Sequence, residues 1–301
     1  MDVSIIIVNY NTKDLTSQTI DSVFKMTKGI SFEVILVDNA SIDGSKDYFQ
    51  TDSRIIYIYS EQNLGFGRAN NLGLSVAKGR NILFLNPDTV LINNAVKILS
   101  DYIDQYNNVG ACGGNLYNED MKPTISYRRI FPGILEELSY LFFHIPEKLF
   151  YHKTRLHNGS NKPLNVANIS GADLMIRKSV LDKVGSFSPV YFMYYEETDL
   201  CFRIHKAGYK IMSVPDAQIQ HLEGKSFKSA CDPRRIQVSE KGRDNFYRQN
   251  YSPLYHKIAN VIYRLTLNLH YMVFRTLGNK DASMICKTKK DILSKLGNTQ
   301  L

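Results

Sequence analysis

The first 113 residues alternate short apolar runs with stretches of helical pattern. The apolar runs predict strands, and their sequences are VSIIIV, FEVILVD, RIIYIY, RNILFLN and NVGACGG. The stretches between them predict helices at about residues 12–27, 43–50, 66–78 and 93–105. Strands that are apolar on both faces and separated by helices are typical of a mostly parallel sheet covered by helices. The pattern therefore predicts an α/β fold.

The pattern that predicts helices and strands is clear in some parts of the chain and weak in others. The first helix is expected to have Asn11 as its N-cap and Asp14 in its first turn. Residues 114–170 are irregular apart from an amphipathic helix near residues 134–143. From residue 171 the pattern becomes regular again: it predicts a strand, a short helix with a glycine turn, a helix capped by Gly208, and further strand segments that lead to His221.

Polar clusters follow three of the predicted strands. They are Asn9-Tyr10-Asn11, Asp38-Asn39-Ala40-Ser41 and Asn86-Pro87-Asp88-Thr89. Ligands of parallel sheets bind beyond the carboxyl ends of the strands, so these clusters are expected to meet at one ligand-binding edge. No GxGxxG follows the first strand and no GxxxxGK[ST] occurs, which disfavours a dinucleotide site and a P-loop.

Five side chains are candidates for chemistry, and each also has a structural explanation. Asp88 could hold a hard cation or simply complete a turn. Glu196, Glu197 and Asp199 crowd the start of a helix, where acids also stabilise the dipole. Asp199 is four residues before Arg203, which predicts an ion pair and leaves Glu197 freer to act as a base. His221 could be a ligand or an ordinary core histidine.

The motifs taken together resemble family 2 glycosyltransferases of the GT-A fold. The resemblance spans about residues 1–225, is strongest to the bacterial rhamnosyltransferase and galactofuranosyltransferase-like branch, and rests on SIIIVNYN, VILVDNAS, NLGFGRANNLGL, LFLNPDT, SGADLMIRK and FMYYEETDLCFRIHKAGY. It implies an inverting, metal-dependent transferase that moves a sugar from dTDP-rhamnose or a UDP-sugar to a cell-surface polysaccharide or a polyprenyl-linked acceptor. The alternative is a nucleotide-sugar-binding protein without transferase activity.

The resemblance also implies site roles. Asp88 stands for the second acid of the family's DxD motif, while Asn86 replaces the first acid, and His221 matches a metal-binding position for Mg²⁺ or Mn²⁺. Glu197 stands where the family usually has an Asp base. The catalytic group is expected to be Glu197, Glu196 and Asp199, and the sugar and acceptor group Gly171, Ala172 and Asp173. The expected nucleotide-sugar contacts are Asn9, Tyr10, Asn11, Asp38, Asn39, Asn63, Gly65, Arg68, Asn86 and Asp88.

Composition and charge add a prediction about the C-terminal part. The chain has 301 residues, of which 44% are hydrophobic, as in an ordinary globular protein with a sizeable core. Residues 222–301 carry 15 Lys/Arg and 6 Asp/Glu, whereas the first 221 residues carry a net charge of −1. The domains are therefore expected to be a catalytic domain of residues 1–225, with halves at 1–113 and 114–225, and a basic helical tail of residues 226–301.

The tail could bind a membrane surface or a partner subunit. The helical stretch 254–277 has apolar, aromatic and basic residues, as interfacial helices do, but it could equally pack on the catalytic domain or in a homodimer. Nucleic acid is disfavoured because no binding module is recognisable. The N-terminal apolar run predicts a buried strand rather than a signal peptide, and the scattered Cys112, Cys201, Cys231 and Cys286 predict reduced thiols. A cytoplasmic protein, peripheral on the inner face of the membrane, is expected.

Overall fold

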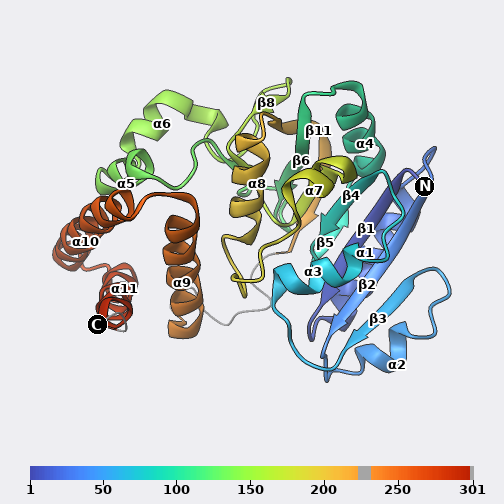
Figure 1. Cartoon of the computed structure of the whole chain (residues 1–301), viewed down its shortest axis with the longest axis horizontal. Helices are drawn as coiled ribbons and strands as arrows, with labels where there is room; N and C mark the ends of the chain where they lie inside the picture. The colour runs from blue at the N-terminus through green and yellow to red at the C-terminus, as the bar shows by residue number, and fades with distance from the viewer. Residues whose placement is uncertain (223–231, 299–301) are drawn as a thin grey trace. The chain divides into compact units, whose positions relative to one another are not determined.

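The computed structural model describes residues 1–222 and 232–298, which form two compact units. We call them the sheet unit and the helical unit (Figure 1). The sheet unit comprises Met1–Arg129, Lys153–Phe192 and Glu196–Ser226, and the helical unit comprises Ile130–His152, Met193–Tyr195 and Phe227–Leu301. The predicted boundary between residues 225 and 226 lies outside the described residues.

The sheet unit is built on a mixed, mostly parallel sheet. Its strands are β1 (Val3–Asn9), β2 (Phe32–Asn39), β3 (Ile56–Ser60), β4 (Asn81–Leu85), β5 (Thr89–Leu91), β6 (Val109–Tyr117), β8 (Leu164–Asn165), β10 (Asp173–Arg177) and β11 (Lys210–His221). Their order is β3-β2-β1-β4-β10-β6-β11-β5, and β8 pairs with β11. The first four strands run parallel, as do β6 and β11, whereas β10 runs antiparallel to both of its neighbours. This confirms the predicted fold class.

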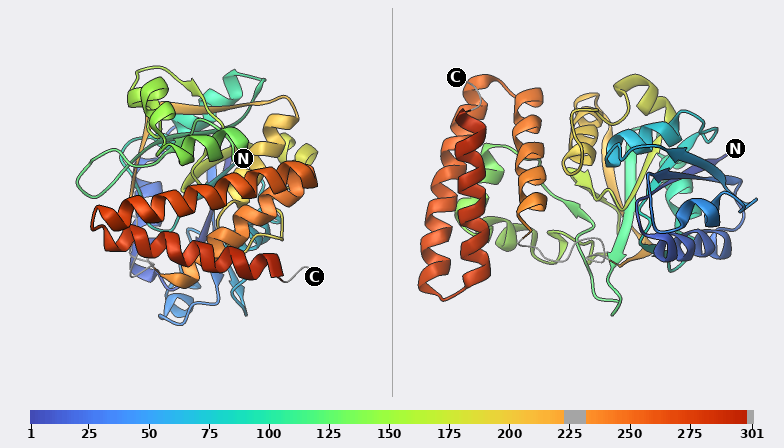
Figure 2. Two further views of the ribbon diagram at one scale, coloured as in Figure 1. Left: turned by 90° about the vertical axis from the view of Figure 1, so that its left-hand side faces the viewer. Right: turned by 90° about the horizontal axis from the view of Figure 1, so that it is seen from below.

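Helices bury both faces of this sheet (Figure 2). They are α1 (Lys13–Met26), α2 (Ser45–Phe49), α3 (Phe66–Leu74), α4 (Ala95–Gln105), α7 (Lys178–Val184) and α8 (Glu196–Lys206). Alternate residues of a strand point to opposite faces. Ile5 and Ile7 therefore join the core formed with α1 and α4, while Ile6 faces α3 at Gly73, where an added Cβ would lie 2.6 Å from the Ile6 side chain. This two-sided burial explains the continuous apolar runs.

Three details differ from the sequence prediction. Asn11 adopts a positive φ of 57°, so Thr12 is the N-cap of α1 and the assignment of Asn11 was wrong. The helix expected at 66–78 ends at Leu74. The separate strand segments expected before His221 form the single strand β11, whose pairing with β6 shifts register between Ser213 and Gln218.

The helical unit contains α5 (Ile134–Leu141), α6 (Ile145–Tyr151), α9 (Pro233–Asn250), α10 (Pro253–Thr276) and α11 (Lys280–Asn298). Figure 2 shows α10 and α11 running side by side. α5 is the amphipathic helix expected near 134–143, and it packs on α10. Its buried Glu137 pairs with Arg243 of α9 and accepts a hydrogen bond from the Tyr247 hydroxyl at 2.8 Å. A buried charge is tolerated only when it is paired in this way.

A two-stranded sheet of β7 (Tyr127–Arg128) and β9 (Asn168–Ile169) adds to the sheet unit. Cys112, Cys201 and Cys286 are buried free thiols, as expected, and Cys231 lies outside the described residues. Burial raises the pKa of Cys201 to about 12, so this thiol stays protonated and is not a nucleophile. The chemistry of the sheet unit therefore depends on its carboxylates and histidines.

Candidate active site

The polar clusters at the strand ends meet at one edge of the sheet. Asn9 and Asp38 are partners in the parallel register of β1 and β2, and Asn86 directly follows β4, which pairs with β1 on its other side. The Asn9 side-chain amide donates to Ser41 Oγ at 3.0 Å, which joins the first cluster to the second. The expected convergence of these residues is confirmed.

Asp38 is fully buried and both of its carboxylate oxygens are bonded. Oδ1 accepts from the Ser41 backbone N–H at 3.0 Å, and Oδ2 accepts from the Tyr57 hydroxyl at 2.9 Å. Burial and this bond raise the pKa of Tyr57, so the hydroxyl remains a donor. Tyr10 is 48% exposed at the end of β1, where its ring is accessible to a planar group. No local pattern in the sequence singles out Tyr57, because its contact with Asp38 depends on the register between β2 and β3.

The segment before α3 is tied to the end of β2. Asn39 donates to Asn63 Oδ1 at 3.0 Å, and its Oδ1 accepts from the Leu64 N–H at 2.8 Å. Gly65 has a φ of +80°, and an added Cβ would lie 2.2 Å from the Phe192 carbonyl oxygen, so only glycine fits. Arg68 is exposed and its Nε donates to the Leu64 carbonyl at 2.6 Å. The structure thus brings Asn63 and Gly65 to the predicted edge.

Asp88 and His221 form a close pair next to Asn86. His221 Nε2 lies 3.2 Å from Asp88 Oδ1 and 3.3 Å from the Asn86 amide nitrogen. The backbone fixes this arrangement, because β5 pairs with β11 at Thr89 and His221, and the Leu222 N–H donates to the Asp88 carbonyl at 2.8 Å. Both side chains are largely buried. Asp88 and His221 are far apart in the sequence, but the pairing of β5 with β11 holds their side chains close enough to bind the same ligand.

This pair fits a divalent cation that takes its other ligands from substrate and solvent. Mg²⁺ is commonly held by one or two carboxylates together with phosphate oxygens and water, and Mn²⁺ also accepts imidazole. Within residues 1–222 and 232–298, no cluster of three or more His, Cys, Asp or Glu side chains has metal-binding geometry. Asp88 and His221 therefore suit a cation that is bound together with an anionic ligand, rather than a cation enclosed by protein side chains alone.

The acidic start of α8 contains carboxylates in different environments. Glu196 is buried, its Oε2 has no hydrogen-bond partner among the described residues, and burial together with the charge of Glu197 raises its pKa well above the usual value. Glu197 is partly exposed, accepts from the Thr198 hydroxyl at 3.0 Å, and has a pKa raised mainly by burial. Asp199 bonds Arg203 Nε at 2.9 Å, which confirms the expected ion pair. Glu197 is therefore the most accessible of the three carboxylates.

Residues 171–173 lie between the Asp88–His221 pair and the acidic start of α8. An added Cβ at Gly171 would lie 3.8 Å from the Glu197 side chain, and the Ala172 carbonyl accepts from the Asn86 N–H at 3.0 Å. Asp173 is fully buried, and its Oδ2 accepts from the Gly114 N–H at 2.5 Å. Burial raises the pKa of Asp173 well above its usual value. This carboxyl supports β6, and its contact with a substrate stays a prediction.

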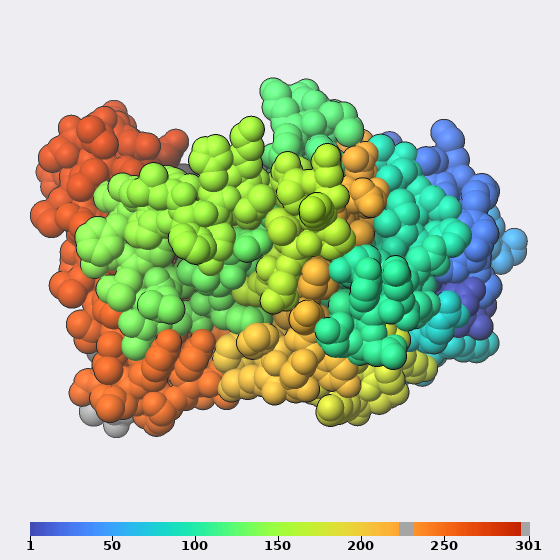
Figure 3. Space-filling view, turned by 90° about the horizontal axis from the view of Figure 1, so that it is seen from above, coloured from blue at the N-terminus to red at the C-terminus, as the bar shows by residue number. Residues whose placement is uncertain are grey.

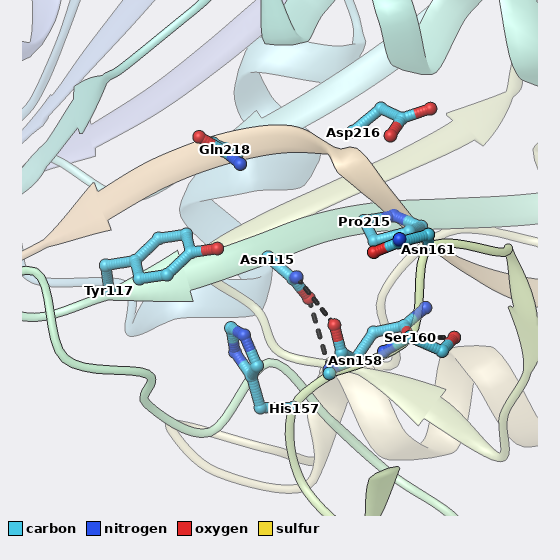
Figure 4. A pocket seen from close by; sticks show the side chains of 10 residues that line it. Asn115, Tyr117, His157, Asn158, Ser160, Asn161, Pro215, Asp216 and Gln218 are labelled. Atoms are coloured by element: carbon cyan, nitrogen blue, oxygen red, sulfur yellow. Dashed lines mark hydrogen bonds between the residues drawn. The ribbon is translucent and has the colours of Figure 1, made fainter. Parts of the chain in front are cut away.

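A polar pocket of about 290 Å³ lies where the β6–β11 pairing shifts register (Figure 4). Asn115 of β6 and Asn158 form its floor through two reciprocal hydrogen bonds of 3.0 and 3.2 Å. The other lining residues are Tyr117, His157, Gly159, Ser160, Asn161, Pro215, Asp216 and Gln218. Burial lowers the pKa of His157, which keeps its imidazole neutral. Amide, hydroxyl and carboxylate groups around one cavity suit a small ligand rich in hydroxyl groups.

Comparison with known proteins identifies the family. The model for glycosyl transferase family 2 matches residues 4–185, which contain Asp38, Asp88 and Asp173. The chain belongs to glycosyl transferase family 2. It is therefore a glycosyltransferase that acts in polysaccharide biosynthesis, which confirms the resemblance found in the sequence.

Relatives of this family 2 glycosyltransferase cover most of its length. It is 28% identical, over 94% of its chain and 87% of the relative, to the low-salt glycan biosynthesis hexosyltransferase Agl10 of Haloferax volcanii. It is 29% identical, over 64% of its chain and 67% of the relative, to the N-acetylglucosaminyl-diphospho-decaprenol L-rhamnosyltransferase of Mycobacterium tuberculosis. The mannosyltransferase PcManGT of Pyrobaculum calidifontis, solved with GDP-Man and Mn²⁺, superposes with a TM-score of 0.56 at 15% identity, over 99% of this chain and 76% of that one. This last likeness shows the GT-A-like fold.

Across residues 1–222 and 232–298, every helix is either too short or too polar to cross a bilayer.

Proposed function

We propose that this family 2 glycosyltransferase moves a hexosyl or rhamnosyl group from a nucleotide sugar to a polysaccharide or polyprenyl-diphosphate-linked acceptor, with inversion. The names of the relatives from Haloferax volcanii and Mycobacterium tuberculosis support a hexose or rhamnose donor and a lipid-linked acceptor. The observation that carries the proposal is the placement of Gly171 and Ala172. A Cβ added at Gly171 would lie 3.8 Å from the Glu197 side chain, and the Ala172 carbonyl accepts from the N–H of Asn86, which lies beside the Asp88–His221 pair.

The donor nucleoside is proposed to bind at the ends of β1 and β2. Asp38 is already oriented by two hydrogen bonds, and the exposed Tyr10 offers a ring for stacking against the base. Asn9 and Asn39 hold the flanking loops. Asn11, Asn63, Gly65 and Arg68 complete the proposed donor contacts. dTDP-rhamnose and UDP-sugars are the proposed donors.

Asp88 and His221 are the proposed ligands of Mg²⁺ or Mn²⁺. Such a cation, when bound with the diphosphate, would neutralise the negative charge of the leaving group. Asp88 supplies the carboxylate oxygen and His221 the imidazole nitrogen, and Asn86 fixes the imidazole through its amide. Because Asn86 stands where an acid was expected, the pair has one protein charge fewer, and the diphosphate has to supply more of the ligand oxygens.

Glu197 is the proposed general base. Its carboxylate takes the proton of the acceptor hydroxyl as the oxygen attacks the anomeric carbon, and the bond from that carbon to the diphosphate breaks in line. A single displacement inverts the anomeric configuration. The raised pKa of Glu197 makes it a stronger base once ionised. Glu196 and Asp199 are proposed to support it: Glu196 as the neighbouring buried carboxyl, and Asp199 through the ion pair that anchors α8.

The helical unit is proposed to bind the anionic inner surface of the cell membrane. One face of α10 exposes apolar side chains at intervals of three or four residues: Leu254, Ile258, Val261, Leu265, Leu269 and Met272. Exposed Lys257, Arg264 and Arg275 follow one side of this stripe. α5, α6 and the turn between them add exposed Leu135, Phe142, Leu149 and Phe150, and Figure 3 shows this green segment at the surface beside the red C-terminal helices. Apolar side chains flanked by basic ones are typical of interfacial helices.

The experiment that tests this function measures transfer and donor binding separately. Glu197→Gln removes the base and keeps the size of the side chain, so donor binding with Mn²⁺ is expected to persist while the transfer rate falls by roughly 10²- to 10⁴-fold. Calorimetry with a dTDP- and UDP-sugar panel and a product assay measure the two quantities. Asp182→Asn, the same change at an exposed position of α7, is the matched control and should transfer normally. Full turnover by Glu197→Gln would contradict the base assignment.

A further inference from the structure

Two consecutive tyrosines before the catalytic helix have a strained backbone. Tyr194 and Tyr195 adopt φ values of 67° and 73°. For a non-glycine residue the left-handed region costs on the order of 1–3 kcal/mol. Such a conformation persists only where neighbouring groups hold it in place. The segment Met193–Tyr195 clusters with the helical unit, although the residues on either side of it belong to the sheet unit.

One face of α9 supplies the groups that hold these tyrosines. Gly242 provides close contact with the backbone of Tyr194, the Arg235 guanidinium lies 5.9 Å from the centre of the Tyr194 ring, and the ring of Phe246 lies 6.0 Å from that of Tyr195. These three residues of α9 are seven and four positions apart, so they form a single stripe along the helix.

Gly242 is the residue that permits the closest approach. It lies in the middle of an 18-residue helix, where glycine costs about 1 kcal/mol relative to alanine. An added Cβ would lie 2.7 Å from the Tyr194 carbonyl oxygen and 3.1 Å from Tyr195 Cδ2. Backbone atoms cannot move aside as a flexible side chain would. The absence of a side chain at this position therefore allows α9 to contact the strained turn.

The turn leads directly into the proposed catalytic carboxylates. Phe192 is fixed on the sheet unit by its carbonyl, which accepts from the Phe66 N–H at 2.8 Å. Four residues later Glu196 begins α8, and Glu197 follows. The conformation of the turn Met193–Tyr195 therefore sets where the chain enters α8. A change of φ at Tyr194 or Tyr195 would redirect the first turn of that helix.

We infer that Gly242 is a positioning residue: α9 contacts the Tyr194–Tyr195 turn through it and thereby places the Glu197 carboxylate for proton transfer. The inference rests on the proposed role of Glu197. The contact itself lies within the helical unit, and the chain that continues from Tyr195 into α8 carries its effect to Glu197.

Gly242→Ala tests the inference in the full-length protein. Local helix propensity alone would stabilise α9 by about 1 kcal/mol, so a loss of activity cannot come from a weakened helix. The kcat for transfer is expected to fall by roughly 10- to 100-fold, because displacements of about 1 Å have effects of this size. The dissociation constants of UDP and dTDP in the presence of Mn²⁺ should stay unchanged. Lys241→Ala, at the adjacent exposed position, is the matched control and should keep the wild-type kcat.

Hydrogen exchange gives a readout that does not depend on activity. In Gly242→Ala, the backbone amides at the start of α8 should exchange faster than in the wild type, while those of β1 and β4 stay protected. Wild-type kcat together with wild-type exchange in α8 would overturn the inference and leave the proposed function intact. A wild-type protein that transfers no sugar from any donor would instead overturn the proposed function, and the exchange data would still decide whether α9 positions α8.

Discussion

At the residue scale, burial gives two neighbouring carboxylates different chemistry. Glu196 is 4% exposed with an unbonded Oε2, and its pKa is raised first by burial and then by the charge of Glu197. Glu197 is more accessible and accepts a hydrogen bond from the Thr198 hydroxyl, and burial raises its pKa. As the pH rises, Glu197 is therefore expected to ionise first. The transfer rate should increase with pH as Glu197 loses its proton, and this rise should disappear in Glu197→Gln.

Glu196→Gln should stabilise the fold at neutral pH but not in acid. The folded pKa of Glu196 is raised above the unfolded value, so the unfolded state releases its proton first and stability falls as the pH rises from about 4.5 to the folded pKa. Each unit of the raised pKa costs about 1.4 kcal/mol. Glutamine resembles the protonated carboxyl and stays neutral, so the variant does not lose folding stability in this way as the pH rises. Urea unfolding at pH 4 and pH 7.5 measures the effect.

Asp182→Asn is the control for this prediction, because its carboxylate is exposed and the exchange should change stability little at either pH. Equal destabilisation by Glu196→Gln at both pH values would show that the buried carboxyl is held in its charged form, contrary to the raised pKa.

At the element scale, the register shift in β11 shapes the polar pocket. The pairing with β6 is interrupted between Ser213 and Gln218, and Pro215 and Asp216 of the interrupted stretch line the cavity with Gln218. Gln218 is three residues before His221, which is about 10 Å along a strand. Because side chains alternate along a strand, Gln218 and His221 point to opposite faces of the sheet, and a sugar of the acceptor bound in this pocket would contact Gln218 rather than His221.

Gln218→Ala should weaken acceptor recognition and leave the donor site intact. The amide is a donor and an acceptor for sugar hydroxyls, and losing such a contact costs about 1 kcal/mol, or about fivefold in affinity. The acceptor KM is therefore expected to rise by about fivefold with an unchanged donor KM. Gln237→Ala, at an exposed position of α9, is the control. A rise in the donor KM alone would place the effect in the donor site and contradict an acceptor role.

At the scale of the whole molecule, apolar exposure is concentrated in the helical unit. α10 is apolar on two faces: Ala259, Tyr263 and Leu267 are buried, while Val261 and Leu265 are 53% and 57% exposed. An exposed apolar stripe of this length commonly marks an interaction surface. The basic side chains beside it favour an anionic lipid surface, since each Lys or Arg near such a membrane adds about 1 kcal/mol.

Replacing Val261 and Leu265 with Glu should release the protein from vesicles that contain phosphatidylglycerol. Each apolar side chain contributes on the order of 1.5–3 kcal/mol when fully buried, so binding should fall at least about tenfold. Flotation with vesicles measures it, and Val76→Glu with Ile125→Glu in the sheet unit is the control. Unchanged vesicle binding together with loss of a dimer in light scattering would identify a second copy as the partner of this surface.

The sequence by itself determined the elements and the edge of the sheet at which the chemistry is concentrated. Runs such as IIIV at residues 5–8 and ILFL at residues 82–85 are apolar at every position, and only strands covered on both faces bury such runs, so the order of strands and helices followed. The ion pair between Asp199 and Arg203 also followed, because residues four apart on a helix are neighbours. These features depend on local periodicity, which the sequence carries directly.

Only the tertiary structure decided which distant residues meet. Tyr57 bonds Asp38 because of the register between β2 and β3, and Asp88 contacts His221 because β5 pairs with β11. Gly242 contacts the Tyr194 turn because α9 packs against a segment about fifty residues earlier in the chain. Long-range register and packing arise from the whole set of contacts, and local patterns do not encode them. The polar clusters were therefore predictable from the sequence, whereas the partners that orient them were not.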